Sequence, residues 1–183
     1  MNIVTAPDSV LSQTAKPIDT ITKDVLQLIE EMKKTLLATK DPQGVGLAAS
    51  QVGKSVRIFI TKPTDHSAFT TFINPMVTNL STQLVPVKRP KKSKRSHKLE
   101  GCLSLPNIWG FVLRSPKVKV DYLDEKGEKR TRTHTGFMAT IIQHEIDHLD
   151  GILFPKRVLE QKQKLFKSHK NKDNEDVFDE IEL

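Results

Sequence analysis

The segment QHEIDHLDG, residues 143–151, decides how the fold of this chain is interpreted. The apolar side chains around it cover the broad face expected of a helix that runs through a core: Phe137, Met138, Ile141, Ile142 and Ile146. The sequence therefore predicts a helix over 137–149, which Gly151 ends. Residues four apart lie on the same face of a helix, so His144 and His148 would present their imidazoles to one ion.

This H-E-x-x-H pattern indicates hydrolytic chemistry. Neutral imidazoles suit Zn²⁺, Fe²⁺, Ni²⁺ and Co²⁺, and a catalytic site needs three protein ligands with a fourth position open to water. A bound divalent cation lowers the pKa of that water toward neutrality, and Glu145 can then take its proton and pass it to a leaving amine. The alternative is that both histidines are ordinary polar residues on a partly buried helix, because a five-residue pattern also arises by chance.

The third metal ligand separates the possible classes of metallohydrolase. In zinc proteases with this pattern the third ligand lies downstream, but the only histidine after Gly151 is His169, in a basic stretch. Upstream, the sequence EGCLS at 100–104 contains the only cysteine, Cys102, which excludes an internal disulfide. A lone cysteine is more often a small buried hydrophobic residue than a ligand. Beside the histidine helix, however, its thiolate completes a Cys/His/His set.

The hydrophobic pattern elsewhere predicts a single α+β domain, with antiparallel strands packed around the central helix and a helix near each terminus. Apolar residues at three- and four-residue intervals predict the N-terminal helix over 19–40. Strands are expected at 56–60, 69–73 and 76–80, a hairpin at 118–122 and 129–135, and a basic helix at 155–170. We assign 1–170 to one catalytic domain with a basic insertion at about 83–98, and 171–183 to an acidic tail whose composition is compatible with disorder.

Composition favours a cytoplasmic protein with no membrane contact. The 183 residues, 37% of them hydrophobic and 28% charged, suit one globular domain. No apolar run approaches the roughly 20 residues that a membrane-spanning helix needs. Residues 1–16 lack the features of a secretory or organelle-targeting signal. The net charge of +7 suggests anionic partners.

Three stretches resemble the motifs of the peptide deformylase family: GVGLAASQ at 44–51, EGCLS at 100–104 and QHEIDHLDG at 143–151. Their order and spacing also agree with that family. The resemblance implies an enzyme that removes the formyl group from the N-terminal formyl-methionine of newly made polypeptides and releases formate. It implies one divalent metal ion on Cys102, His144 and His148, Fe²⁺ in the cell, with Zn²⁺, Ni²⁺ or Co²⁺ as alternatives.

The resemblance also implies roles for residues around the metal ligands. Glu145 would be the general base and acid, and the Gln51 side chain and the Leu103 backbone N–H would stabilise the oxyanion. Glu100 and Arg114 would form an ion pair behind the ligands, although two solvated surface charges are the more common arrangement for such residues.

Further residues are expected to contact the substrate. Gly44 and Gly46 would let the backbone run close to an extended peptide, whereas a simple turn explains glycines that are considered alone. The methionine pocket would contain Val45, Phe137 and Ile141, and core packing explains these three equally well. Trp109 stands where many family members have Arg or Tyr in contact with substrate, so it either covers the cleft or anchors its loop.

Nascent polypeptide N-termini are the expected partners, and the ribosome is a second candidate. The basic segment KRPKKSKRSHK at 88–98 could attract ribosomal RNA by counterion release, and the C-terminal helix could dock similarly. A flexible solvated loop is at least as good an interpretation of 88–98. Two other functions stay open at this point: an RNA-binding protein with a structural metal site, and a zinc peptidase.

Overall fold

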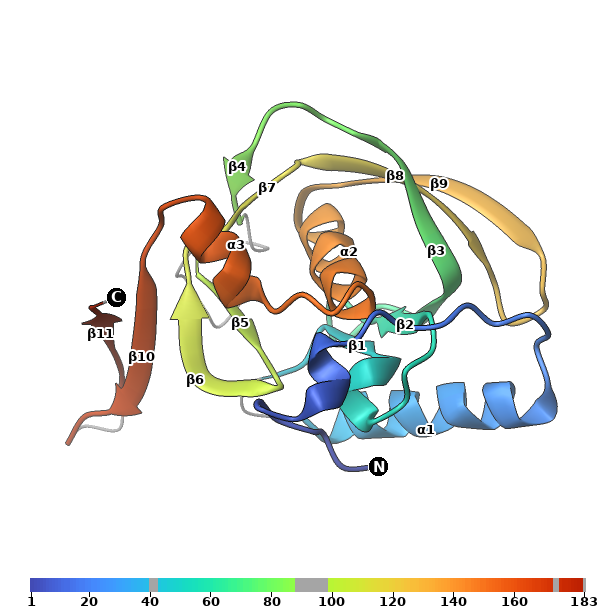
Figure 1. Cartoon of the computed structure of the whole chain (residues 1–183), viewed down its shortest axis with the longest axis horizontal. Helices are drawn as coiled ribbons and strands as arrows, with labels where there is room; N and C mark the ends of the chain where they lie inside the picture. The colour runs from blue at the N-terminus through green and yellow to red at the C-terminus, as the bar shows by residue number, and fades with distance from the viewer. Residues whose placement is uncertain (40–42, 88–98, 173–174, 183) are drawn as a thin grey trace.

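The computed structural model places the histidine-bearing helix, α2 (Gly136–Leu149), between two antiparallel sheets (Figure 1). The structure describes residues 1–39, 43–87, 99–172 and 175–182. The architecture is a single α+β domain of antiparallel sheets and helices, which confirms the predicted fold class.

The larger sheet curves around one side of α2 (Figure 1). Its strands lie in the order β1-β2-β3-β8-β9, and every neighbouring pair is antiparallel. In that order their bounds are Gly46–Ala48, Ile58–Thr61, Thr70–Leu80, Lys117–Leu123 and Lys129–Thr135. The predicted hairpin is therefore present as β8 and β9, and the strand expected over 56–60 is β2.

One long strand, β3, replaces the two strands that were expected at 69–73 and 76–80. Its pairing with β8 shifts register between Ile73 and Met76. A bulge at this point lets the chain accommodate Pro75, which cannot donate to the ladder, without ending the strand.

A buried core joins the larger sheet to α2. Phe59 of β2 and Phe72 of β3 stack with their ring centroids 4.4 Å apart. They belong to one buried cluster with Ala139 and Ile142 of α2. Full burial of one such aromatic side chain stabilises a fold by roughly 1.5–3 kcal/mol, so this core holds α2, and with it the two histidines, in a fixed position.

The N-terminal helix, α1 (Lys23–Ala38), covers the β1–β2 end of the larger sheet. It begins where the Thr22 hydroxyl accepts a hydrogen bond from the Val25 N–H at 3.4 Å. Its apolar stripe is buried against β1 and β2 through Ile29, Met32 and Leu36. Two short 3₁₀ helices lie nearby, η1 (Ser9–Ser12) and η2 (Ala49–Val52).

The smaller sheet lies on the other side of α2 and has the strand order β11-β10-β6-β5 (Figure 1). From β5 outward the strands are Glu100–Cys102, Leu105–Gly110, Leu165–Lys170 and Asp176–Ile181. A further pair joins β4 (Val85–Pro86) to β7 (Leu113–Arg114). This sheet contributes the cysteine strand, β5, to the site.

The prediction of a C-terminal helix to about residue 170 is wrong beyond its first two turns. Helix α3 is Phe154–Glu160, and the chain then turns through Lys162, whose φ of 53° an α-helix cannot contain. Strand β10 follows, because Leu165 finds a buried place beside β6. That stabilisation comes from residues far away in the sequence, so local periodicity did not reveal it.

The acidic tail pairs with the basic stretch before it. Strand β11 lies antiparallel to β10, and ion pairs join Lys170 to Asp176 at 2.8 Å and Lys164 to Glu180 at 2.7 Å. Opposite charges on facing strands favour this hairpin modestly. The described part of the tail is thus a strand of the domain's own sheet.

The basic segment at 88–98 lies outside the described residues, and only the start of the predicted insertion, with β4, is described. Among the helices of the described chain, none combines the length and apolar character that crossing a membrane requires.

Candidate metal centre and active site

Two elements bring the predicted metal ligands together. Helix α2 carries His144 and His148, and the end of β5 carries Cys102. The Cys102 Sγ lies 3.1 Å from Nε2 of His148, and one ligand atom from each of the three residues lies within 4.8 Å of the others. Cys102 and His148 are buried, and His144 is partly buried.

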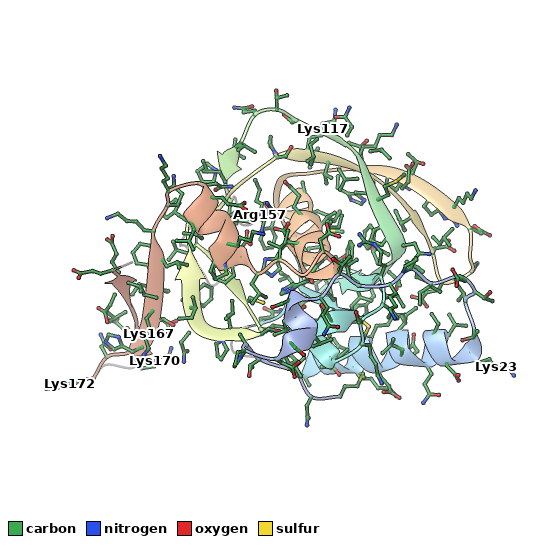
Figure 2. The ribbon with its side chains drawn as sticks, in the orientation of Figure 1. Lys23, Lys117, Arg157, Lys167, Lys170 and Lys172 are labelled. Atoms are coloured by element: carbon green, nitrogen blue, oxygen red, sulfur yellow. The ribbon has the colours of Figure 1, made fainter. Side chains whose placement is uncertain are left out.

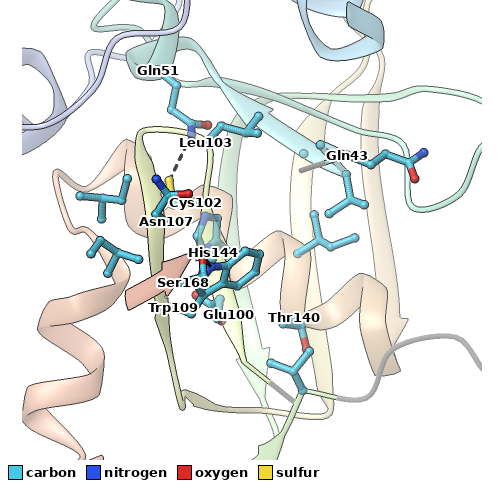
Figure 3. Close-up of a pocket in the computed structure, with 18 of the residues that line it drawn as sticks. Gln43, Gln51, Glu100, Cys102, Leu103, Asn107, Trp109, Thr140, His144 and Ser168 are labelled. Atoms are coloured by element: carbon cyan, nitrogen blue, oxygen red, sulfur yellow. Dashed lines mark hydrogen bonds and ion pairs between the residues drawn. The ribbon is translucent and has the colours of Figure 1, made fainter. Parts of the chain in front are cut away.

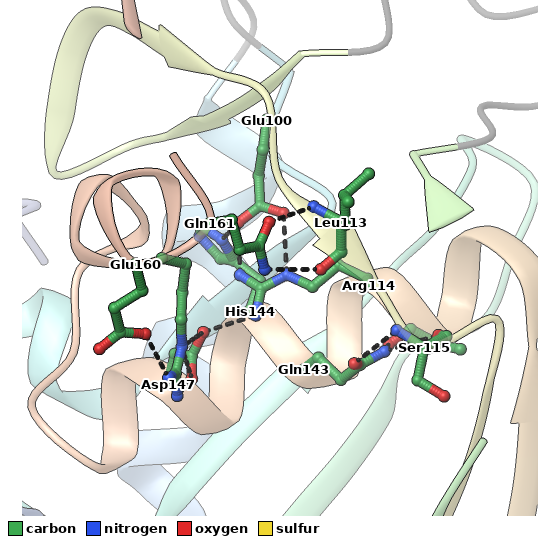
Figure 4. A network of polar contacts seen from close by, with 11 residues as sticks. Glu100, Leu113, Arg114, Ser115, Gln143, His144, Asp147, Glu160 and Gln161 are labelled. Atoms are coloured by element: carbon green, nitrogen blue, oxygen red, sulfur yellow. Dashed lines mark hydrogen bonds and ion pairs between the residues drawn. The ribbon is translucent and has the colours of Figure 1, made fainter. Parts of the chain in front are cut away.

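An ion pair behind the ligands orients one imidazole. Glu100 Oε1 lies 2.7 Å from Nδ1 of His144, and Arg114 donates two hydrogen bonds to the Glu100 carboxylate, at 2.6 and 3.1 Å (Figure 4). The expected Glu100–Arg114 pair is therefore present and buried. Because Nδ1 is occupied by the carboxylate, Nε2 is the His144 atom left for a metal.

The same network continues to a second carboxylate, which was not among the predicted site residues. Arg114 Nη1 donates to Asp147 Oδ2 at 2.6 Å, and Arg157 of α3 donates to Asp147 Oδ1 at 2.7 Å (Figure 4). Asp147 is only 6% exposed. Its helical position three residues after His144 was the available signal. The network ties β5, β7, α2 and α3 together behind the ligands.

Two of the ligands, Cys102 and His144, have shifted pKa values. Burial alone would raise the pKa of the Cys102 thiol, but the charge of His148 and hydrogen bonds with both imidazoles lower it to about 5. Burial would lower the pKa of His144, but Glu100 and the Cys102 sulfur raise it well above its usual value. A thiolate thus lies beside the protonated imidazole of His144, and a metal ion replaces such protons when it binds.

Glu145 is almost fully buried beside the ligands. Burial raises its pKa to about 7, against the opposing effect of the two histidine charges. Its Oε2 has no hydrogen-bond partner in the described chain, and the same is true of Nδ1 of His148. An unpartnered buried carboxylate oxygen of this kind needs a water or substrate atom.

The donor set fits a divalent transition metal. A thiolate and two imidazoles are ligands for Zn²⁺, Fe²⁺, Ni²⁺ and Co²⁺, and three protein ligands leave an open position for water. Within the described chain, Cys102, His144 and His148 form the cluster of potential ligand side chains that could hold a metal ion. The residues therefore form a metal site with Glu145 beside it.

Gln51 approaches the thiolate from η2. Its side-chain Nε2 lies 3.4 Å from Cys102 Sγ (Figure 3) and 3.3 Å from Ser104 Oγ. Its Oε1 accepts a 2.9 Å hydrogen bond from the Ala48 N–H. The accepting bond fixes the orientation of the amide, so the NH₂ end points toward the metal ligands.

A cavity of about 490 Å³ opens next to the ligands, within the usual size of small-molecule pockets. Figure 3 shows it from close by. All the residues that were expected to contact substrate line it: Gly44, Val45, Gly46, Phe137, Ile141 and Trp109. Leu103 also lines the cavity, as do Asn107, Thr140 and part of β10, which the sequence analysis missed.

Strand β1 passes close to the Glu145 carboxylate at Gly46. A side chain at this position would collide with the Glu145 carboxylate. The glycine therefore permits a backbone approach that no other residue allows. This is a stronger reason for glycine than a turn, because the chain here is strand β1.

Trp109 lies in the cavity wall and contacts the C-terminal hairpin. Its Nε1 donates to Ser168 Oγ at 2.9 Å, and its ring meets Phe178 edge to face with centroids 5.9 Å apart. A side chain at Gly101 would overlap the indole. The tryptophan thus both lines the cleft and anchors β6 to the C-terminal hairpin.

A helix with two histidine ligands, a cysteine ligand from a neighbouring strand and a buried glutamate together define a metal-dependent hydrolase. The model of the family described as "Polypeptide deformylase" matches residues 1–164. A peptide deformylase of Neisseria meningitidis serogroup C is 37% identical over 164 residues, 89% of each chain. The chain belongs to the peptide deformylase family, as its three motifs predicted, and is a metallohydrolase that removes N-formyl groups.

Solved structures agree with this assignment. The crystal structure of peptide deformylase from Thermotoga maritima superposes with a TM-score of 0.74 at 33% identity, over 85% of this chain and 95% of that one. A peptide deformylase from Synechococcus elongatus, in complex with actinonin, has a TM-score of 0.74 at 32% identity, over 86% of this chain and 78% of that one.

Proposed function

We propose that this enzyme deformylates the N-terminal formyl-methionine of new polypeptides, with Glu145 as its general base and acid. The observation that carries the proposal is the unpartnered Glu145 Oε2, buried beside the Cys/His/His group at the cavity. Burial keeps the pKa of this carboxyl near neutrality, at about 7. A group with such a pKa can accept a proton and give it back within one turnover.

Glu145 would move a single proton twice. Cys102, His144 and His148 would hold a divalent cation, which would supply the Lewis acidity that lowers the pKa of a neighbouring water. Glu145 takes the proton from the attacking water and transfers it to the methionine nitrogen as the C–N bond breaks. The products are formate and a free N-terminal amine.

Gln51 and the Leu103 backbone N–H would stabilise the oxyanion that forms on the formyl oxygen. The Gln51 amide already points at the ligands, and its present acceptors there are a sulfur and a hydroxyl. Sulfur is a weak acceptor, so the amide could turn to a developing oxyanion without losing a strong bond. One donor of this kind is worth about 3–4 kcal/mol in related chemistry.

The substrate backbone would lie along the free edge of β1. Within the described chain β1 pairs only with β2, and its residue Gly46 lines the cavity. An extended peptide could add there as a strand, with the Gly46 N–H as one donor. Gly44 would let the backbone before this edge pack closely against Leu36 and Thr39, which a side chain there would overlap. The methionine side chain would occupy the apolar part of the cavity formed by Val45, Phe137 and Ile141.

We further propose Fe²⁺ as the metal in the cell and the cytoplasm as the site of action. The ligand types also accept Zn²⁺, Ni²⁺ and Co²⁺, so metal supply and geometry would decide between them. Metal analysis of protein prepared anaerobically from its own host would test the proposal, and a Zn²⁺ content near one per chain without iron would contradict it.

The basic segment at 88–98 is our candidate contact with ribosomal RNA, because a dense polycation binds phosphates by counterion release. Docking through a C-terminal helix is not proposed, since that segment is a short helix followed by a hairpin. Deleting 88–98 should weaken salt-dependent binding to purified ribosomes. Unchanged binding would leave the segment without this role.

Formate release tests the proposed mechanism. Wild-type protein and Glu145→Gln would be assayed on formyl-Met-Ala-Ser amide at equal metal content. Glu182→Gln, which changes an exposed acid that does not line the cavity, is the control. We expect the Glu145 variant to lose about 10²–10⁴-fold in kcat and the control to match wild type. Equal rates in all three proteins would reject Glu145 as the acid and base.

A further inference from the structure

The C-terminal hairpin, β10 with β11, forms part of the substrate cavity. The family match ends at residue 164, and β10 begins at Leu165. The hairpin therefore adds a wall outside the part of the chain that the family model covers. Four consecutive residues of β10 line the cavity, 167–170, together with Asp176 of β11.

This wall is fixed to the strands of the metal site. Strand β10 pairs with β6, where Phe166 lies opposite Trp109 and Lys167 opposite Ile108. Leu165 is buried in a cluster that includes Cys102. With the Trp109–Ser168 hydrogen bond, these contacts hold β10 in a defined place beside the cleft.

The basic residues of this wall differ in whether they contact an acidic side chain. Lys170 is paired with Asp176 at 2.8 Å, and His169 with Asp179 at 3.1 Å. Lys167 also lines the cavity, but it makes no ion pair within the described chain and is exposed to solvent. Figure 2 labels Lys167 and Lys170 on this hairpin.

We propose that Lys167 is a specificity-determining residue that favours substrates with a carboxylate shortly after the formyl-methionine. The inference rests on the proposed peptide substrate, whose chain must leave the metal site through the same cavity. Asp179 lies opposite Lys167 in the hairpin but contacts His169, so the Lys167 ammonium is available for an acidic side chain at the second or third residue of the substrate. Because the pair would be exposed, its contribution is modest and sensitive to salt.

The test compares kcat/KM for peptide amides, which lack a terminal carboxylate. Formyl-Met-Glu-Ala and formyl-Met-Ala-Glu amides are each compared with the analogue that carries lysine in place of glutamate. Wild type should prefer the acidic peptide at one of these positions by about two- to five-fold at low salt. Lys167→Gln should remove the preference, and Lys167→Glu should reverse it.

A matched control lies five residues along the same hairpin. Lys172 is exposed and does not line the cavity, so Lys172→Glu changes the charge equally and should leave the preference as in wild type. No preference in wild type, or the same preference in Lys167→Glu, would overturn the inference. Turnover of formyl-Met-Ala-Ser amide by wild type separates this outcome from failure of the proposed function, because it does not depend on peptide charge.

Discussion

Arg114→Met would remove a cation that two buried carboxylates share. The guanidinium contacts Glu100 at 2.6 and 3.1 Å and Asp147 at 2.6 Å. Arg114 and Glu100 are each 5% exposed and Asp147 is 6% exposed. Without the arginine, water cannot readily solvate the two acids, and one or both must remain charged in the interior or take up a proton.

The expected loss is large. Breaking a buried ion pair by removing one partner costs about 3–5 kcal/mol, which is a substantial fraction of the roughly 5–15 kcal/mol that stabilises a typical domain. For a chain of this length, that loss lowers Tm by roughly 6–20 °C. Glu100 also orients His144, so metal affinity should fall by about 10–100-fold.

Calorimetry and metal titration of the metal-free protein would measure the two effects separately. Arg157→Met is the matched control, because Arg157 also binds Asp147 but has a side chain 32% exposed. It should lose clearly less stability and almost no metal affinity. A Tm loss in Arg114→Met no larger than that of Arg157→Met, with unchanged metal affinity, would refute the view that this network supports the ligands.

Three other outcomes follow from the site. Gly46→Ala should lower kcat/KM sharply and destabilise the protein by about 1–3 kcal/mol, because the new methyl group meets the Glu145 carboxylate; unchanged kinetics would contradict the close approach. Gln51→Leu should reduce kcat about 10²–10³-fold with little change in KM if Gln51 is an oxyanion donor, and a change confined to KM would argue against it. The pKa of Glu145 in the folded protein, about 7, lies above its usual value, so metal-free protein should lose stability as pH rises from about 4.5 through 7. Glu145→Gln should lessen that loss when thermal unfolding is measured over a pH series. An unaltered pH profile would be inconsistent with the raised pKa.

Local patterns predicted the centre of the molecule well. His144 and His148 follow from helical spacing alone, and apolar flanks such as Ile142 placed that helix in the core. Val118, Val120 and Tyr122 of β8 alternate with polar residues and a turn sequence follows, so the hairpin with β9 was evident. Cys102 was joined to the histidines because no suitable ligand follows them in the sequence, and the motif set then supported that choice. Helical spacing could not show this contact, which spans 46 residues of sequence and depends on tertiary packing.

The features that sequence did not reveal depend on distant partners. Leu165 and Phe166 suggested a helical seam, but they form a strand because β6 offers an open edge beside Trp109. No local pattern marked Asp147, which is buried where Arg114 and Arg157 reach it from β7 and α3. In each case a non-local contact outweighs the weak local preference.

The most direct test of the central claim is X-ray absorption at the metal edge of the loaded enzyme, compared with Cys102→Ser. If Cys102, His144 and His148 hold the metal, wild type should contain one sulfur and two imidazole nitrogens in the metal's coordination sphere, and the variant should contain no sulfur. A wild-type spectrum without sulfur, or one identical to that of the Cys102→Ser protein, would contradict the assignment of the lone thiol as the third ligand.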